Sequence, residues 1–329
     1  MEETVTSLPK KQINKSLNVL KCIAIFAVIC IHCGFYSNNL MGASIDSLAR
    51  FAVPLFFLIS GFYSFYTDNN KALNKYKTRI IRLLYLSIIS NIMYFVFFLI
   101  TKYDFNIISY LTKLLSSGNI FKLIILNLTP TAGPLWFIQA LLYCYILVYI
   151  ISKCNMLKYV NKLYVYIPIL LISSIMLGEM SHLINLKINI EIYRNFLFMG
   201  LPFFLSGYLI HEYENKIKNM ISNNFILYSI IPCCLLIILE TIATGKSDIY
   251  IGTIILTILI FIWAVKNPDT LNIGVLEWIG GKLYVYMYIL HYMVIKLLEH
   301  TINLNFLNSI IYFIITAILS IIVYFILDY

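Results

Sequence analysis

The sequence predicts an all-α integral membrane protein, a bundle of about ten transmembrane helices. Three observations support this fold class: 61% of the 329 residues are hydrophobic, only 12% are charged, and the mean hydropathy is +0.86. Ordinary soluble domains contain about 25% charged residues. Because each membrane crossing takes ~20 apolar residues, the chain has room for about ten crossings. This composition excludes a soluble catalytic domain.

Ten apolar runs follow one another along the chain. The first resembles a signal peptide, but it has no small-x-small cleavage site, so we expect an uncleaved first helix. The longest connection, 102–133, contains the stretches 105–116 and 119–128, which suit short helices lying at the outer membrane surface. We interpret residues 1–329 as one transmembrane domain with a cytoplasmic N-terminal segment, 1–16. The predicted spans are 17–36, 47–66, 80–101, 134–152, 162–179, 194–211, 224–243, 249–266, 283–299 and 306–327.

The distribution of basic residues predicts the orientation of the bundle. About two thirds of the 24 Lys and Arg residues fall at the N-terminus and in every second connection. Cytoplasmic loops carry the excess of Lys and Arg in membrane proteins, so we expect both termini and the connection 67–79 in the cytoplasm. This bias accounts for the formal net charge of +9, and no nucleic-acid partner is predicted.

The first span contains two ionisable residues, Lys21 and His32. Their spacing of 11 places them on one helix face at ~100° per residue, about 16 Å apart along the axis. Ionisable groups inside a membrane are expensive enough to mark functional sites, and a long donor with a phosphate head can span this distance. Alternatively, Lys21 is a snorkelling positive-inside anchor and His32 is a polar residue bonded to a neighbouring helix.

The two cysteines on either side of His32 in the sequence do not indicate a metal site. Cys30 and Cys33 form a CxxC motif, but no second ligand pair follows at zinc-finger spacing. All seven cysteines lie in or near apolar runs, where we expect unpaired thiols.

The start of the third span contains a pair of arginines. Arg79 and Arg82 are three residues apart and therefore face the same way on a helix, near three lysines of the preceding connection. Two guanidinium groups suit a phosphate through bidentate hydrogen bonds. The alternative is that the pair is ordinary positive-inside charge.

The second span begins with polar residues on its outer side. Arg50 precedes Pro54, which we expect to open or kink the helix, and Gly61 allows a neighbouring helix to pack closely.

Three later residues complete the set of candidates. Trp136 enters the fourth span at an interface and equally suits an aromatic-belt anchor. Arg194 precedes the sixth span on the outer side, and His291 lies in the middle of the ninth. A second intramembrane histidine strengthens the prediction of a polar cavity.

These segments, in this order, resemble the acyltransferase-3 family of membrane acyltransferases over nearly the whole chain. The chain departs from the family pattern in two places: Lys21 replaces the commoner Arg, and Asn18 stands where many members have an acidic residue. The matches are the basic residue and histidine of the first helix (Lys21, His32), the Arg-x-x-Arg pair (Arg79, Arg82), the Leu-Trp-Phe motif (Leu135 to Phe137) and the Tyr-x-x-His pattern (Tyr288 to His291).

The resemblance implies transfer of an acyl group, usually acetyl, from cytoplasmic acyl-CoA to a hydroxyl of a cell-envelope glycan outside a bacterial plasma membrane. Acyl-CoA is then a substrate, and no permanently bound cofactor is expected. His32 is implied as the catalytic residue, either as a base or as the group that is itself acylated. Lys21, Arg79 and Arg82 are implied to bind acyl-CoA. The candidates for the cavity or the acceptor side are Arg50, Trp136, Arg194 and His291.

Two other functions compete with this one. The segment RFAVPLFFLISGF also resembles the membrane domain of vancomycin-resistance serine racemases, so transport of serine or another small solute is the alternative. A non-catalytic scaffold is the third possible function. A scaffold, however, needs neither an intramembrane histidine nor a group of basic residues at the entrance of a donor site. The chain ends soon after its tenth run without an appended racemase or hydrolase-like domain, which favours a stand-alone enzyme.

Overall fold

Every regular element of the part of the chain that the structure describes is a helix. The computed structural model describes residues 14–37, 39–299 and 306–327, so most of the predicted N-terminal segment, 1–16, lies outside the described residues. The α-helices are α1 Lys15–His32, α2 Leu40–Ala49, α3 Ala52–Phe62, α4 Asn69–Thr101, α5 Ile107–Leu114, α6 Ser117–Leu126, α7 Trp136–Lys153, α8 Tyr166–Ile175, α9 Ser181–Leu183, α10 Leu201–Glu212, α11 Glu214–Met220, α12 Asn223–Thr244, α13 Ile251–Lys266, α14 Gly274–Trp278, α15 Tyr284–Leu298 and α16 Phe306–Leu327.

All ten predicted apolar runs contain helix, and α5 and α6 occupy the two stretches predicted as short helices. Among the described residues, 7 helical stretches are long and apolar enough to cross a membrane. The all-α membrane fold class is therefore confirmed. The 7 stretches are Lys15–His32, Leu40–Phe62, Asn69–Thr101, Gly133–Lys153, Leu157–Leu183, Asn223–Thr244 and Leu307–Ile326, and the helices Ser117–Leu126, Phe196–Glu212 and Ile251–Lys266 are apolar but shorter.

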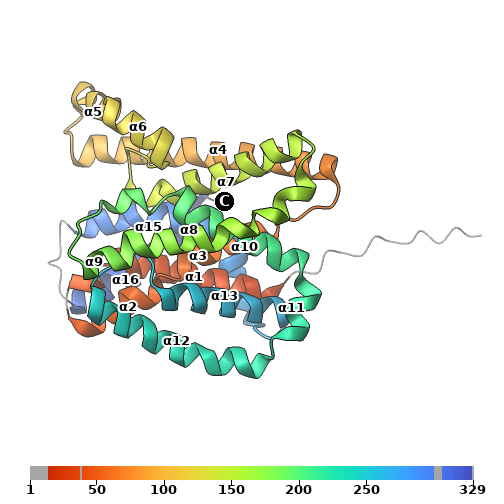
Figure 1. The fold of residues 1–329 in the computed structure, drawn as a ribbon. Coiled ribbons are helices and arrows are strands. Elements are labelled where there is room, and N and C mark those ends of the chain that lie inside the picture. The colour runs from red at the N-terminus through yellow and green to blue at the C-terminus, as the bar shows by residue number, and fades with distance from the viewer. Residues whose placement is uncertain (1–13, 38, 300–305, 328–329) are drawn as a thin grey trace, which may run out of the picture.

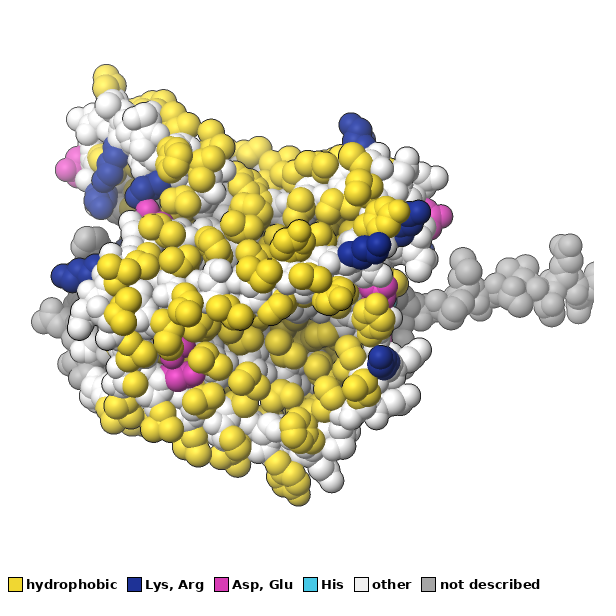
Figure 2. Space-filling model, viewed as in Figure 1, with side chains coloured by type: hydrophobic (Ala, Val, Ile, Leu, Met, Phe, Trp, Pro, Cys, Tyr) yellow, Lys and Arg dark blue, Asp and Glu magenta, His cyan; other side chains and the backbone are white. Residues whose placement is uncertain are grey.

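The axes of the long helices are roughly aligned (Figure 1). Helices α4 and α7 lie on one side of the bundle, α12 lies on the other, and α1 lies between them. The beginnings of α1 and α4 lie at the same end. Hydrophobic side chains cover the middle of the face in Figure 2, and basic side chains gather at its two ends. This distribution matches an apolar membrane core between two polar surfaces.

Helix α1 lies at the centre of the bundle and packs against α2, α3, α13, α14, α15 and α16. Its start is tied to the end of α13. Asn14 caps α1 by accepting a hydrogen bond from the backbone N–H of Leu17 (2.8 Å), while its own amide donates to the carbonyl of Ala264 (3.0 Å). Because one amide side chain satisfies both helix ends, it sets the depth of α1 relative to α13.

The predicted second span, 47–66, is not one continuous α-helix. Helix α2 ends at Ala49, and α3 begins at Ala52. Pro54 explains the break: it has no N–H to donate to the carbonyl of Arg50 four residues earlier, and its ring would clash with that carbonyl. The break leaves Arg50 between two helices, and its side chain is buried (7% exposed).

Helices α3 and α10 cross in direct backbone contact. A Cβ atom on Gly61 would lie 1.8 Å from the carbonyl oxygen of Phe204, and one on Gly207 would lie 2.0 Å from that of Leu58. Such distances leave no room for any side chain. The close packing predicted for Gly61 is thus confirmed, and it is reciprocal, as in membrane helix pairs with small residues at the crossing.

We predict that Gly207→Ala destabilises the folded protein, because its methyl group must push the two backbones apart. Overpacking of this kind costs at least ~1–3 kcal/mol. The measurement is the midpoint of thermal unfolding in detergent. Gly118→Ala on α6 is the control, since nothing lies within 4 Å of its Cβ position. Equal midpoints for the two variants would contradict the crossing.

Candidate functional site

A buried ion network lies at the break between α2 and α3. Arg50 donates hydrogen bonds to Asp46, one turn earlier, with Nη2 at 2.7 Å from Oδ1 and 3.1 Å from Oδ2, and Nε at 3.2 Å from Oδ1. Its Nη1 donates to Asp248, in the connection between α12 and α13. The exposed fractions of Asp46 and Asp248 are 1% and 5%. Removing three charges from water costs several kcal/mol per ion, so the network is stable only while every charge has its partner.

Arg194 adds a second guanidinium beside the same carboxylate. Its Nε lies 3.4 Å from Oδ2 of Asp248 and forms no hydrogen bond with the described part of the chain. The guanidinium carbon lies 5.8 Å from the ring centroid of Trp136, a cation–π contact. Trp136 is only 6% exposed. The ring therefore packs inside the protein, whereas an aromatic-belt anchor would contact lipid headgroups.

The connection that carries Asp248 is held by several hydrogen bonds. The hydroxyl of Tyr250 accepts from the backbone N–H of Ser247 and donates to the carbonyl of Gly245, both at 2.8 Å. Lys246 lies nearby, with Nζ 5.0 Å from the Tyr36 ring. Burial lowers the pKa of Lys246, an effect that Asp46 partly offsets. The loop thus brings basic and acidic groups together at one end of the bundle.

Two imidazoles meet beside this network. His32 is the last residue of α1 and half-buried, and His291 on α15 is completely buried. Their ring centroids are 5.2 Å apart, and the ring of Tyr292 lies 5.8 Å from His32. The planes of the two imidazole rings are inclined by 42° to each other.

Hydrogen bonds define the protonation of His291. Its Nδ1 lies 2.7 Å from the carbonyl oxygen of Tyr288 and 3.2 Å from that of Met287. Because carbonyl oxygens only accept, Nδ1 carries the hydrogen, and in the neutral ring Nε2 keeps its lone pair. Nε2 is buried and has no hydrogen-bond partner among the described residues.

Most predicted outer-side residues line one cavity. Its volume is about 240 Å³, and its wall includes His32, Arg50, Trp136 and Arg194 together with Asp248. His291 contacts the His32 ring but does not line this cavity. The structure therefore brings the four predicted residues together around one space, which we call the His32 cavity.

A different cavity, near the start of α4, is lined by the predicted arginine pair. Its volume is about 520 Å³, and Arg79 and Arg82 line it with Lys71, Lys75 and His211. Both arginines are exposed, so their charges are available to a ligand. We call this space the basic cavity.

Lys21 lies beside a third and narrower space of about 110 Å³, which we call the Lys21 cavity. Apolar residues such as Phe56 and Leu141 form much of its wall. The Lys21 ammonium donates a hydrogen bond to Asn18 Oδ1 (3.1 Å) and lies 5.5 Å from the ring centroid of Tyr284. Asn18 is uncharged, so it holds the lysine without neutralising its positive charge. A carboxylate at this position would neutralise that charge.

Lys21 and His32 line different cavities, with a partition between them. The hydroxyl of Tyr288 donates a hydrogen bond to the carbonyl of Pro134, and the Phe137 ring packs against the Tyr288 ring at 5.5 Å. Pro134 lines the His32 cavity, whereas Phe137 and Tyr288 line the Lys21 cavity. A molecule that reached from one to the other would have to displace this partition.

The sequence analysis missed three residues of the site. Asp46 had a usable signal, because it stands four residues before Arg50 and so faces it on a helix. Asp248 had a weaker one, as an acid between two apolar runs. Tyr292 had no such signal, because nothing in the sequence distinguishes it from the other tyrosines of a chain that contains 26.

Comparison with known proteins assigns the class. A family model described as an acyltransferase domain matches residues 14–329. Together with the apolar helices and the polar site at the end of α1, this match defines a membrane acyltransferase. The chain belongs to the acyltransferase-3 family. Searches of curated proteins and of solved structures returned no significant match.

We predict that Asp248→Asn lowers the stability of the fold by ~3–5 kcal/mol, the usual cost of removing one partner from a buried ion pair. The change keeps the shape of the side chain and removes only its charge. Thermal unfolding of the purified protein in detergent measures the loss. Glu191→Gln is the control, because it breaks an exposed pair with Lys122 (side chains 25% and 41% exposed) that contributes ~0–1 kcal/mol. Similar losses in both variants would contradict the assigned importance of the network.

Proposed function

We propose that the protein transfers an acyl group, typically acetyl, from cytoplasmic acyl-CoA to a hydroxyl of a cell-envelope glycan outside a bacterial plasma membrane. The order of the three cavities along α1 is the observation that carries this proposal. His32 at the end of α1 lines the His32 cavity, and Lys21 nearer its start lines the Lys21 cavity. Arg79 of the basic cavity lies close enough to Lys21 for their charges to interact. This order matches a donor with a charged head, a slender arm and a reactive end.

In this proposal the CoA phosphates bind in the basic cavity. Arg79 and Arg82 offer planar guanidinium groups that bind phosphate oxygens two at a time. Lys21, whose charge lies close enough to Arg79 to interact with it, adds a cation at the entrance to the Lys21 cavity. The uncharged arm of the donor occupies the apolar space beyond and reaches the His32 cavity when Tyr288 moves away from Pro134.

His32 acts as the general base in this mechanism. His291 Nε2 has no partner among the described residues of the ligand-free structure. When the substrates are bound, the N–H of His32 donates to this lone pair, which orients the ring and leaves the other nitrogen of His32 free to take the proton of the acceptor hydroxyl. The hydroxyl oxygen forms a bond to the thioester carbon, the C–S bond breaks, and the leaving sulfur takes the proton back from His32. The Arg194 guanidinium is placed to stabilise the negative oxygen that forms on the way. His291 is a positioning residue.

The mechanism requires a defined orientation in the membrane. We propose ten crossings with both termini in the cytoplasm, because the basic cavity is formed by residues of the segment 65–82 and His211, and basic residues favour the cytoplasmic side. In this topology residues 1–16 are cytoplasmic and the whole chain is one domain.

We predict that a cysteine placed at position 74 reacts with membrane-impermeant maleimide only after cells are opened. Asn74 is exposed at the start of α4, so Asn74→Cys is accessible from its own side of the membrane. The exposed Cys154 is replaced by Ser in the background. Labelling in intact cells would place position 74 outside the cell. This result would contradict the proposed topology and the cytoplasmic entrance of the donor.

We predict that His32→Ala lowers acyl transfer ~10²- to 10⁴-fold, the usual contribution of a general base, while the protein stays folded and inserted. The assay is transfer of labelled acetyl from acetyl-CoA to cell-envelope material. His291→Phe should lower kcat in the same direction, whereas His291→Gln, which offers a polar atom near the position of Nε2, should retain much more activity. Equal activities of the Phe and Gln variants would contradict the orienting role, and a labelled acyl-enzyme would make His32 the acyl acceptor.

We predict that Arg79→Lys and Arg82→Lys each weaken binding of acetyl-CoA by roughly tenfold. Lysine keeps the positive charge, and with it the topology, but loses the planar fork. Calorimetry on the purified protein measures the affinity. Lys77→Arg on the same helix, which does not line the basic cavity, is the control. Unchanged affinity in both lysine variants would contradict the phosphate-binding role and indicate that Arg79 and Arg82 only orient the helix in the membrane. If the wild-type protein bound no CoA at all, a small-solute transporter would be favoured.

A further inference from the structure

A fourth cavity lies beside the His32 cavity, between the end of α4, helix α5 and α15. Its volume is about 470 Å³, and it shares two lining residues, Gly133 and Tyr292, with the His32 cavity. We call it the outer cavity, because the proposed topology places it outside. A ligand held here lies next to the reacting groups.

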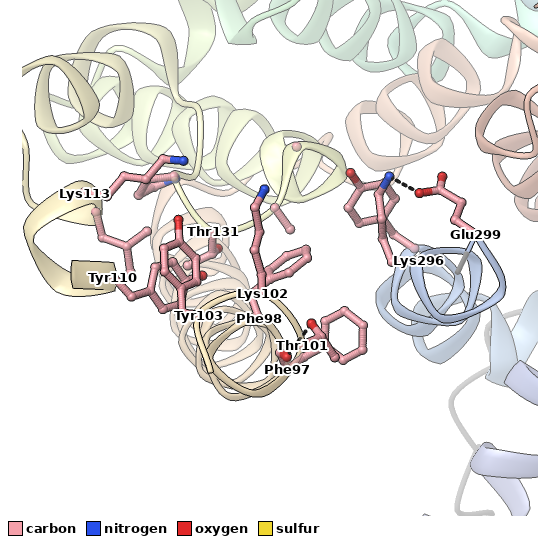
Figure 3. A pocket seen from close by; sticks show the side chains of 15 residues that line it. Phe97, Phe98, Thr101, Lys102, Tyr103, Tyr110, Lys113, Thr131, Lys296 and Glu299 are labelled. Carbon is pink, nitrogen blue, oxygen red and sulfur yellow. Dashed lines mark hydrogen bonds and ion pairs between the residues drawn. The ribbon is translucent and has the colours of Figure 1, made fainter. Parts of the chain in front are cut away.

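Three lysines and one glutamate line the outer cavity. Figure 3 shows the amino groups of Lys113, Lys102 and Lys296 in a row along one side. Lys296 forms an ion pair with Glu299 (2.6 Å). Within the described residues, neither Lys102 nor Lys113 forms an ion pair, so the cavity keeps an excess of positive charge.

The position of these lysines is unusual for a membrane protein. Lys102 follows the last residue of α4, and Arg79 lies 23 positions earlier, which is about 35 Å along the helix. That length is close to the ~30 Å of the hydrocarbon core, so the two basic groups lie on opposite sides of the membrane. The positive-inside bias explains Arg79 but acts against Lys102 and Lys113. Their charge therefore needs a reason other than orientation.

Aromatic rings form another part of the wall. Tyr110 is stacked between Tyr103 (centroids 4.3 Å apart) and Phe95 (4.9 Å). Its side chain is only 3% exposed, and its hydroxyl is buried without a hydrogen-bond partner in the described part of the chain. An unsatisfied buried hydroxyl costs ~1–3 kcal/mol, which a ligand that hydrogen-bonds to it would recover.

We propose that the outer cavity binds the acceptor and that the acceptor is an anionic glycan. Its negative groups lie against Lys102 and Lys113. Its sugar rings lie against Tyr103, with a sugar hydroxyl bonded to Tyr110. A hydroxyl farther along the chain passes Tyr292 and reaches His32. This assignment rests on the proposed acyl transfer and adds the charge of the acceptor to it.

The test measures binding without acyl-CoA, in phosphatidylcholine nanodiscs. The probes are phosphorylated maltohexaose and the unmodified sugar. We expect the wild-type protein to prefer the phosphorylated sugar by roughly tenfold. The double variant Lys102→Gln/Lys113→Gln should lose the preference. Lys187→Gln, an exposed lysine that does not line the outer cavity, should keep it. Equal binding of the two sugars, or an unchanged preference in the double variant, overturns the proposal.

Tyr110→Phe separates binding from folding. Because the hydroxyl has no partner, its removal should not lower the unfolding temperature of the ligand-free protein, yet it should weaken binding of both sugars. A parallel fall in stability would make the hydroxyl structural and contradict its assignment.

Two further arms separate the remaining explanations. Binding of labelled phosphatidylglycerol that depends on Lys102 and Lys113, without any preference between the sugars, would assign the site to a lipid headgroup and overturn the proposal.

Acetyl transfer is assayed separately. A sugar preference without transfer contradicts only the proposed function, whereas transfer without the preference contradicts only the anionic acceptor site.

Discussion

The ion network around Arg50 is the constraint on which the rest of the site depends. Pro54 breaks the second span just after Arg50, which pairs with Asp46 one turn earlier and with Asp248 on a distant loop. Because these side chains are buried, their charges have no water to compensate a missing partner. The network therefore fixes the loop, and through Asp248 it also fixes Arg194 beside His32. The network thus joins the break between α2 and α3 to the loop between α12 and α13.

Helix α1 separates the two halves of the proposed chemistry while keeping them on one rigid element. Lys21 and His32 share a helix face, but the partition formed by Tyr288 and Pro134 divides the spaces they line. Close packing at α1 supports this arrangement, since a Cβ on Gly280 would lie 1.8 Å from the carbonyl oxygen of Asn18. The depth of Lys21 is therefore set by backbone contact.

Basic residues lie near both ends of α4, which the proposed topology places on opposite sides of the membrane. Arginines near its start line the basic cavity, and Lys102 at its end lines the outer cavity. The helix is long enough, at 33 residues, to separate the two groups by about the thickness of the hydrocarbon core. A donor and an acceptor that both carry negative charge would then be attracted to opposite ends of the bundle, and would meet only at His32.

The sequence alone determined the class of the protein, because apolar runs of spanning length and the spacing of Lys21, His32, Arg79 and Arg82 are local properties of the chain. Only the tertiary structure decided which residues meet. Asp248 reaches Arg50 across 198 positions, and the His291 ring, bonded to a carbonyl of its own helix, meets the His32 ring at the end of α1. No local pattern encodes such contacts, since they depend on how the helices pack and on where one proline interrupts a span.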